Sequence, residues 1–145
     1  MRSLGQAERA FDLMCRRAND RMLGGRPLAA KQLTQLAVYE SYEDIQACRL
    51  MVLDTAAKLD RGEQARVELS TIKVACARMV GRVVDRAVQL HGAYGLFDEN
   101  PLSMMGGRGL RLADGPDEVH IERVGRILLR TYADGASWDF ADPAR

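Results

Sequence analysis

Hydrophobic residues recur at helical spacing along most of the chain. Over the first twenty residues they alternate at intervals of three and four, which places them on one face of a helix. This first stripe consists of Leu4, Ala7, Phe11, Met14 and Ala18. Residues 24–27, Gly-Gly-Arg-Pro, end the pattern, because glycine relaxes the backbone restraints and proline cannot continue a helix. The sequence therefore opens with one amphipathic helix.

Two longer segments repeat this pattern. A second helix is predicted from about residue 28 to residue 59, and Asp60-Arg-Gly62 marks its end. Its stripe is Ile45, Cys48, Val52, Thr55 and Leu59. A third helix is predicted from about Ala65 to the glycine at position 92. Its apolar face is Leu69, Ile72, Cys76, Met79, Val83 and Leu90.

The last third of the chain is more broken. Asn100 and Pro101 predict the start of a short helix, with asparagine as the cap and proline in the first helical position. The glycines of residues 106–109 interrupt it, and the last helix is predicted to begin after Gly115. No segment has a convincing strand pattern. Residues 133–145, which include a lone Trp138, are expected to form a tail of low local order unless the tryptophan docks on a partner.

These elements predict an all-α fold, an up-and-down four-helix bundle plus a short extra helix over residues 1–132. A length of 145 residues suits one domain. The formal net charge of +1 argues against nucleic acid as a partner, and no apolar run approaches the roughly 20 residues of a membrane span. Three cysteines without paired spacing indicate free thiols, so a cytoplasmic location is expected.

Several polar residues have two readings on the sequence alone. Asp114, which precedes Gly-Pro, either caps the last helix or faces a ligand. Arg21 and Gln89 either serve nearby helix ends or contact a bound group. His91 and His120 suggest a metal, but residues 117–120, Asp-Glu-Val-His, supply only half of a di-iron motif and no second copy exists. No metal site is predicted.

Two stretches in order carry a family resemblance. They are Gln89-Leu-His-Gly-Ala-Tyr-Gly95 and Asp114-Gly-Pro-Asp-Glu118. Upstream of both, Arg21 is followed eleven residues later by Gln32. Together with the opening Gly5-Gln-Ala-Glu-Arg-Ala-Phe11, they resemble the C-terminal domain of the acyl-CoA dehydrogenases, almost without gaps from about residue 5 to residue 130. The segment Leu112-Ala-Asp-Gly-Pro-Asp-Glu-Val-His120 resembles a branch of that family that uses aspartate.

The resemblance implies an FAD site shared between subunits. Arg21 and Gln32 stand where the family's arginine and glutamine reach the FAD phosphates and adenine of a neighbouring subunit, and guanidinium suits a pyrophosphate. Gln89 and Gly92 stand where a glycine turn approaches the adenosine diphosphate half of that FAD. Gly24 replaces the family's phenylalanine, and Ala93 replaces the second glycine of the turn.

The resemblance also implies a catalytic base. Asp114 stands where the family's glutamate removes the α-proton of the acyl thioester, and a carboxylate in an apolar pocket can do this chemistry. Pro116 and Glu118 stand where threonine and glutamine help to hold FAD, and they complete the predicted cofactor-binding set.

Two functions follow from this resemblance. The first is FAD-dependent α,β-desaturation of acyl-CoA thioesters. The N-terminal and middle β domains of such an enzyme would lie before Met1. They are expected either to be supplied by a completing subunit or to be lost by truncation. The second is a non-catalytic helical interaction module. Under either function, exposed apolar faces predict a homo-oligomer, a dimer or a tetramer.

Overall fold

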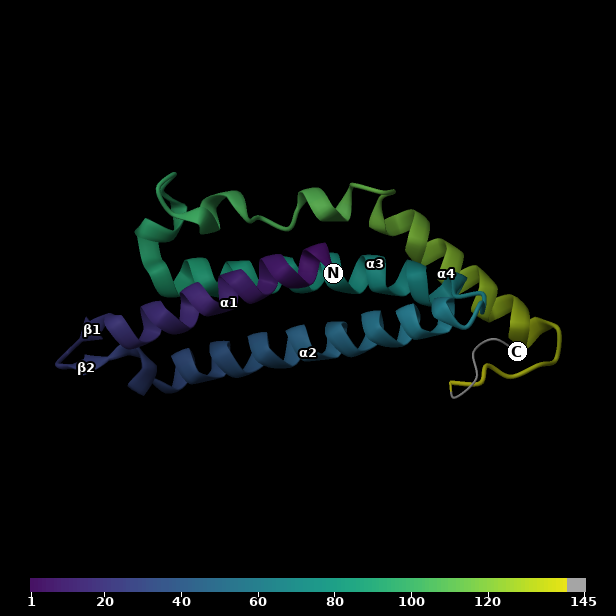
Figure 1. Ribbon diagram of the computed structural model, residues 1–145, viewed down its shortest axis with the longest axis horizontal. Helices are drawn as coiled ribbons and strands as arrows, with labels where there is room; N and C mark the ends of the chain where they lie inside the picture. Colours follow the sequence, from purple (N-terminus) through teal and green to yellow (C-terminus); the bar gives the residue numbers. More distant parts are fainter. Residues whose placement is uncertain (141–145) are drawn as a thin grey trace.

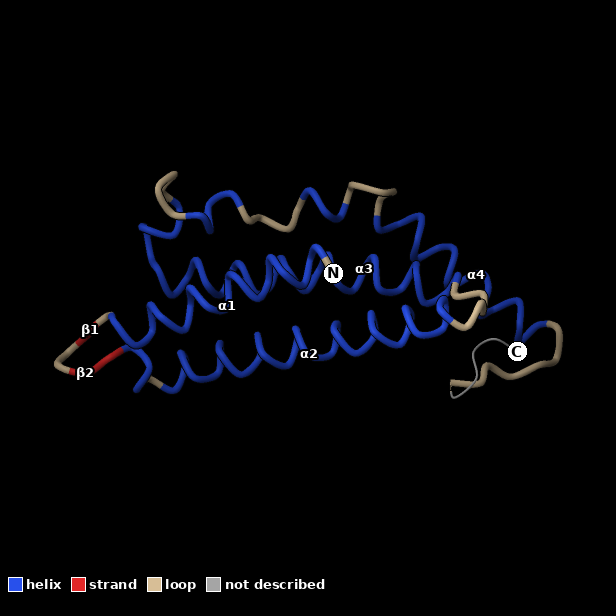
Figure 2. Tube along the Cα trace, viewed as in Figure 1, coloured by secondary structure: helices blue, strands red, loops and turns tan. Residues whose placement is uncertain are grey.

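The computed structural model describes residues 1–140, and helices make up most of it (Figure 1, Figure 2). In chain order the elements are α1 (Arg2–Asp20), β1 (Met22–Leu23), β2 (Arg26–Pro27), η1 (Leu28–Ala30), α2 (Gln32–Asp60), α3 (Arg66–His91), η2 (Gly92–Leu96), η3 (Pro101–Met104), η4 (Gly109–Arg111) and α4 (Asp117–Ala133).

The three longest helices, α2, α3 and α1, lie lengthwise against one another and run in alternating directions (Figure 1). The 3₁₀ turns η2, η3 and η4 return along α3 to its N-terminal half, where α4 packs mainly against α3. This arrangement confirms the predicted all-α, up-and-down bundle. Within residues 1–140 no helix is long and apolar enough to cross a membrane.

The predicted stripes form the core. All of the residues predicted for the first helix are buried except Phe11, which is partly buried against the core. Further along, Ile45 and Val52 of α2 belong to the same core cluster as Met79 and Val83 of α3. A helix whose apolar residues share one face can bury them only against other helices, which is why the three long helices pack together. Two positions at the ends of stripes differ from the prediction: Leu59, the last of the second stripe, and Leu69, the first of the third, are exposed.

The prediction of no strands is wrong for residues 22–27. Here Met22 pairs with Pro27 and Leu23 with Arg26 in a two-stranded antiparallel ladder. Gly24 and Gly25 form the connecting turn with φ of +62° and +76°. Two consecutive residues with positive φ make the tight turn whose twist matches a hairpin, and glycine adopts it without steric cost. The glycines therefore build a hairpin after α1 has already ended at Asp20.

The start of the second long helix also differs from its prediction. Residues 28–30 form the 3₁₀ turn η1, and Lys31 is extended with ψ of 133° before α2 begins at Gln32. The predicted short helix does start at Asn100, whose side-chain oxygen accepts a hydrogen bond from the Leu102 amide at 3.0 Å. It forms a 3₁₀ turn of four residues rather than an α-helix.

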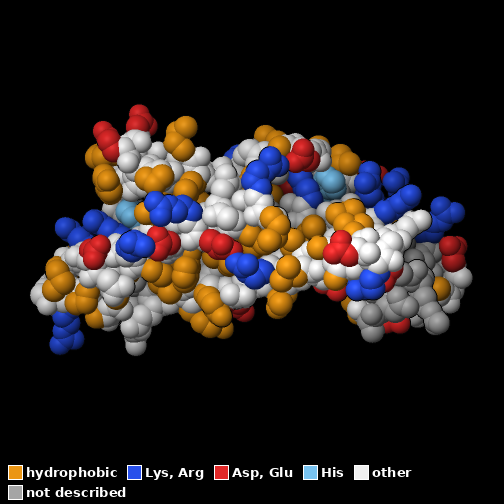
Figure 3. Space-filling model, in the orientation of Figure 1, with side chains coloured by type: hydrophobic (Ala, Val, Ile, Leu, Met, Phe, Trp, Pro, Cys, Tyr) orange, Lys and Arg blue, Asp and Glu red, His pale blue; other side chains and the backbone are white. Residues whose placement is uncertain are grey.

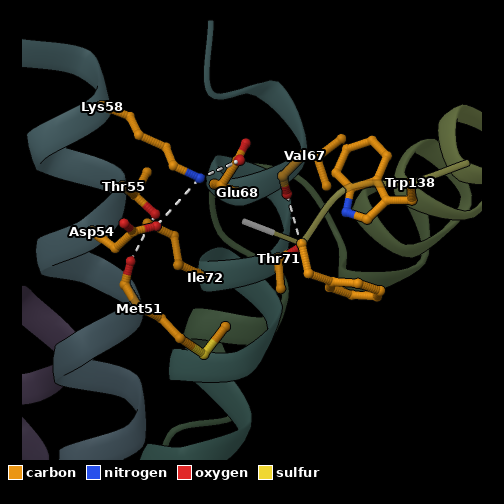
Figure 4. Close-up of a pocket in the computed structure, with 10 residues that line it drawn as sticks. Met51, Asp54, Thr55, Lys58, Val67, Glu68, Thr71, Ile72 and Trp138 are labelled. Carbon is orange, nitrogen blue, oxygen red and sulfur yellow. Dashed lines mark hydrogen bonds and ion pairs between the residues drawn. The ribbon is translucent and has the colours of Figure 1, made fainter. Parts of the chain in front are cut away.

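The described part of the C-terminal tail contacts the bundle. Trp138 is half-buried and lies over a crevice of about 190 Å³ between α2 and α3 (Figure 4). In the crevice, the Lys58 ammonium lies 2.9 Å from Glu68 and 3.4 Å from Asp54. Trp138 thus docks on its own chain. Residues 141–145 of the predicted tail lie outside the described residues.

Candidate functional site

The predicted site residues fall into two groups along α3. Gln89 and Gly92 lie at the C-terminal end of this helix, whereas Asp114 and its neighbours lie beside the N-terminal half, where Asp117 contacts Lys73. At about 1.5 Å per residue, Lys73 and Gln89 are roughly 24 Å apart along the axis. A single chain therefore does not bring Gln89 and Gly92 into one site with the predicted base, whereas Pro116 and Glu118 lie beside Asp114.

Beside the first group, a pocket of about 350 Å³ lies between the start of α2 and the end of α3. Gln89 lines this pocket together with Leu28, and the Leu28 amide donates a hydrogen bond to the carbonyl oxygen of Arg21 at 2.9 Å. Gln32 begins α2 at the same end of the bundle. Arg21, Gln32 and Gln89, from three different segments, thus lie at the same end of the bundle.

These three side chains are free to contact a ligand. Arg21, Gln32 and Gln89 are all exposed, and across residues 1–140 none of the three side chains forms a hydrogen bond or an ion pair. A guanidinium and two amides supply donors that suit phosphate oxygens and a nucleobase edge. The donor chemistry at this end of the bundle fits the adenosine diphosphate half of FAD.

The turn after α3 requires its first glycine. Gly92 has φ of 66° and ψ of −149°, a region open essentially to glycine alone, and its amide donates to the carbonyl oxygens of Gln89 and Val88. Gly95 is buried, and a Cβ there would lie 3.0 Å from the Val88 carbonyl oxygen. Ala93, in contrast, is exposed and has no positive φ, so its methyl group fits the turn.

The second group centres on Asp114. In the described chain, Asp114 is the one non-glycine residue with positive φ, at 58°, and Gly115 follows with φ of 96°. Its carboxylate is 77% exposed and lies 3.2 Å from the Arg2 guanidinium. The His120 Nε2 donates a hydrogen bond to the Asp114 carbonyl oxygen at 3.1 Å. This bond ties the backbone of the turn to α4, which carries His120.

The capping alternative for Asp114 is wrong. Helix α4 begins at Asp117, its N-cap residue is Pro116, and no side chain caps it. Asp114 instead stands on the rim of a pocket of about 230 Å³, which Lys73 and Cys76 also line. Pro116 and Glu118 are exposed beside it. Pro116 has neither an N–H nor a hydroxyl group to donate, so its side chain can offer a cofactor only apolar contact.

Cys76 is a buried thiol at the Asp114 pocket. A hydrogen bond from the Cys48 thiol lowers the pKa of Cys76 to about 7 against the opposing effect of burial, and the charge of the chain's N-terminal amine also lowers it. The same hydrogen bond and burial raise the pKa of Cys48. All three cysteines are free, and Cys48 and Cys76 belong to the hydrophobic core.

Sequence reasoning missed the most heavily paired acid of this region. The Asp117 carboxylate is 1% exposed and lies 2.8 Å from Arg111, 3.1 Å from Lys73 and 3.5 Å from Arg78. Burial by itself raises its pKa, but the hydrogen bonds and charges of Arg111 and Lys73 outweigh burial and leave the pKa of Asp117 below its ordinary value. Asp117 therefore fastens the turn that carries Asp114 to α3.

The histidines have structural partners. His91 is buried, and its Nδ1 donates to the Ala87 carbonyl oxygen at 2.8 Å. His120 bonds the Asp114 carbonyl oxygen, as described above. Within residues 1–140, no three histidine, cysteine, aspartate or glutamate side chains gather in a cluster that could hold a metal ion.

The chain matches known proteins over nearly its whole length. Residues 1–129 match the family model described as acyl-CoA dehydrogenase, C-terminal domain. A probable acyl-CoA dehydrogenase of Mycobacterium tuberculosis, FadE2, is 41% identical over 133 residues, which cover 89% of this chain and 33% of that protein. Human acyl-CoA dehydrogenase family member 11 is 39% identical over 137 residues, covering 92% of this chain and 18% of that protein.

Solved structures show the same fold. Butyryl-CoA dehydrogenase from Megasphaera elsdenii superposes with a TM-score of 0.85 at 28% identity, over 88% of this chain and 34% of that one. An acyl-CoA dehydrogenase from Geobacillus kaustophilus superposes with a TM-score of 0.84 at 25% identity, over 87% of this chain and 34% of that one. The chain thus spans a third or less of the length of the curated relatives it matches.

Proposed function

Because the chain belongs to the acyl-CoA dehydrogenase family, in which it matches the C-terminal domain, we propose that it is the helical part of an FAD-dependent enzyme that forms the α,β double bond of acyl-CoA thioesters. The observation that carries the proposal is Asp114. A carboxylate in an unusual backbone conformation, at the rim of a pocket and held from both sides of its turn, is the arrangement that a positioned general base needs.

In this proposal Asp114 removes the α-proton of the thioester and holds it on a carboxylate oxygen. FAD, when bound, supplies the acceptor for the hydride that leaves the β-carbon. The base must be ionised and free, so the exposed pair between Asp114 and Arg2 has to open when substrate enters. An exposed pair of this kind is worth at most about 1 kcal/mol, which makes its opening inexpensive.

The cofactor contacts belong to the other end of α3. Arg21, Gln32, Gln89 and the backbone around Gly92 would hold the adenosine diphosphate part of FAD, with Pro116 and Glu118 flanking the Asp114 turn. Because the two groups lie roughly 24 Å apart along α3, we propose that they serve different FAD molecules in an assembled oligomer. The chain would then contribute to two sites and complete neither alone.

One observation is compatible with the alternative of an interaction module as well as with the enzyme. One face of α2 exposes a series of large apolar side chains, Leu33, Leu36, Tyr39, Leu50 and Leu53. Figure 3 shows hydrophobic side chains gathered along the edge of the molecule that α2 forms. Apolar surface of this extent is typical of a contact with another copy or a completing subunit. Both functions therefore predict an oligomer.

A flavin titration separates the two functions. We expect the purified chain, alone or with a completing polypeptide, to bind FAD, and Arg21→Ala and Gln89→Ala to weaken binding by about tenfold each, since each removes a hydrogen bond to a charged phosphate. Arg123→Ala is the matched control, because Arg123 is also exposed. Without FAD binding in any of these samples, the interaction module is the remaining function.

Turnover tests the base. With an acyl-CoA substrate, FAD and an artificial electron acceptor, Asp114→Asn is expected to abolish dehydrogenation and leave FAD binding unchanged. Asp98→Asn is the control, because Asp98 is an exposed acid far along the chain from the pocket. Turnover by the Asp114→Asn protein at the wild-type rate rules out Asp114 as the base.

A further inference from the structure

A second groove with a different chemistry lies where the loop before α4 crosses α3. It has a volume of about 510 Å³, and its lining shares Ala77 alone with the Asp114 pocket. The lining residues are Ala77, Arg78, Gly81, Arg82, Asp85, Gly107, Arg108 and Arg111. Four arginines against one aspartate give the lining a formal charge of +3.

The backbone of the loop rests directly on the helix at the floor of this groove. A Cβ on Gly107 would lie 2.8 Å from the Gly81 nitrogen and 3.1 Å from the Val80 side chain. Only glycine permits so close an approach. The contact brings two arginines of the loop, Arg108 and Arg111, beside two arginines of α3.

Three of the four guanidinium groups are oriented by a carboxylate. The Nε of Arg111 lies 2.8 Å from Asp117, and the Nε of Arg78 lies 3.5 Å from the same carboxylate. Asp44 accepts from the Nε and Nη2 of Arg82 at 3.1 Å and 2.6 Å. Each acid engages the Nε edge of its arginine. Both Nη groups of Arg78 and Arg111, and Nη1 of Arg82, have no partner within residues 1–140 and remain available as donors.

The fourth arginine has no acid of its own. Arg108 is exposed, and its side chain forms no hydrogen bond or ion pair with any described residue. Asp85 is the one acid of the lining, and it is also exposed and unpaired there. Like charges held in one groove repel one another, and a bound dianion relieves that repulsion.

We propose that this groove binds a phosphorylated ligand, a phosphate monoester or a diphosphate, with Arg108 as the free cation and the Nη donors of Arg78, Arg82 and Arg111 as its fixed partners. Guanidinium groups match phosphate oxygens in pairs, and groups already held by carboxylates lose little freedom on binding. The site is additional to the proposed function, which places the cofactor contacts at the end of α3 and the base at Asp114.

Calorimetric titration of the full chain with inorganic pyrophosphate tests the site. At low ionic strength we expect saturable binding that weakens as salt is added. Arg108→Gln should weaken it by about tenfold, because a charge-assisted contact is lost. Asp85→Asn should tighten it by a few-fold, because the one acid of the groove is removed. Arg123→Gln, which changes an exposed arginine of α4 outside the groove, should leave it unchanged.

The source of the phosphate is read from a second titration. Tighter binding of ADP or CoA than of pyrophosphate supports a ligand whose diphosphate is carried by a nucleotide, and equal binding supports a free diphosphate. Arg108 and Arg123 are both exposed, so circular dichroism should show wild-type helix content in both variants. Absence of saturable pyrophosphate binding overturns the proposal, and so does an equal loss of affinity in the Arg108 and Arg123 variants.

Discussion

Replacement of Asp117 by alanine should destabilise the protein more than removal of any surface acid. The substitution removes a carboxylate that is 1% exposed and leaves Lys73, Arg111 and Arg78 facing one another without it. Lys73 keeps only its hydrogen bond to the Arg111 carbonyl oxygen at 3.1 Å. The turn that carries Asp114 then loses its main attachment to α3.

The magnitude follows from the exposure of the three cations. Removing one partner of a buried ion pair costs about 3–5 kcal/mol, because the remaining charge is left without compensation. Arg111 and Arg78 are 34% and 46% exposed, so water can solvate them after the substitution. Lys73 is only 14% exposed and gains less from water. We therefore expect the low end, a loss of about 3 kcal/mol in the free energy of unfolding, or about 9 °C in Tm for a chain of this size.

The pH dependence checks the cause. The pKa of Asp117 is lower in the folded chain than its ordinary value, so its ionised form stabilises the fold above the unfolded pKa, and this stability is lost as pH falls through the folded pKa. Urea unfolding of the wild type and of Asp117→Asn should differ at pH 7 and converge toward pH 3. Asp98→Ala is the control. A loss below about 1 kcal/mol in Asp117→Ala at pH 7, or a difference that does not shrink in acid, would refute this reasoning.

Two further predictions concern backbone and thiol chemistry. Gly92→Ala should lower the free energy of unfolding by about 2 kcal/mol, because its φ of 66° and ψ of −149° exclude side chains. As the control, Gly5→Ala on the open surface of α1 should raise the free energy of unfolding by up to about 1 kcal/mol. Thermal unfolding measures both variants, and a Gly92→Ala protein as stable as the wild type contradicts the prediction. Iodoacetamide should modify Cys15 before Cys48 and Cys76, because Cys15 is partly exposed whereas Cys48 and Cys76 are buried in the core, where the reagent does not reach them. Peptide mapping at pH 6–9 gives the order of modification, and earlier modification of Cys76 disproves the prediction.

The helical architecture is predictable from this sequence because the apolar period is long and regular. The stripe from Leu4 to Ala18 is repeated in the two helices that follow. Each stripe occupies one face of its helix, so that face is the one that packs into the core. The hairpin at Gly24 and Gly25 is not predictable in the same way. Two consecutive glycines indicate the end of a helix, but they do not distinguish an irregular loop from a turn between two paired strands. The 3₁₀ form of residues 101–104 likewise depends on the Asn100 bond and on packing rather than on composition.

The sequence predicts which residues belong to the candidate site, but it does not predict their arrangement in space. The placement of Arg21, Gln32 and Gln89 at one end of the bundle depends on how η1 meets the end of α3, which no local pattern encodes. An exposed acid before Gly-Pro can cap a helix, and only the position of α4 shows that Asp114 does not.

Asp117 shows why the same sequence signal can carry two different functions. An acid in the first turn of a helix is expected to complement the helix dipole, and Asp117 occupies that position. Its carboxylate, however, accepts hydrogen bonds from Lys73 on α3 and from Arg111 on the preceding loop. The same carboxylate therefore holds the Asp114 turn and orients two arginines of the phosphate groove. Because one buried acid fastens both features, ligand binding in the groove and the position of the proposed base should be coupled through Asp117.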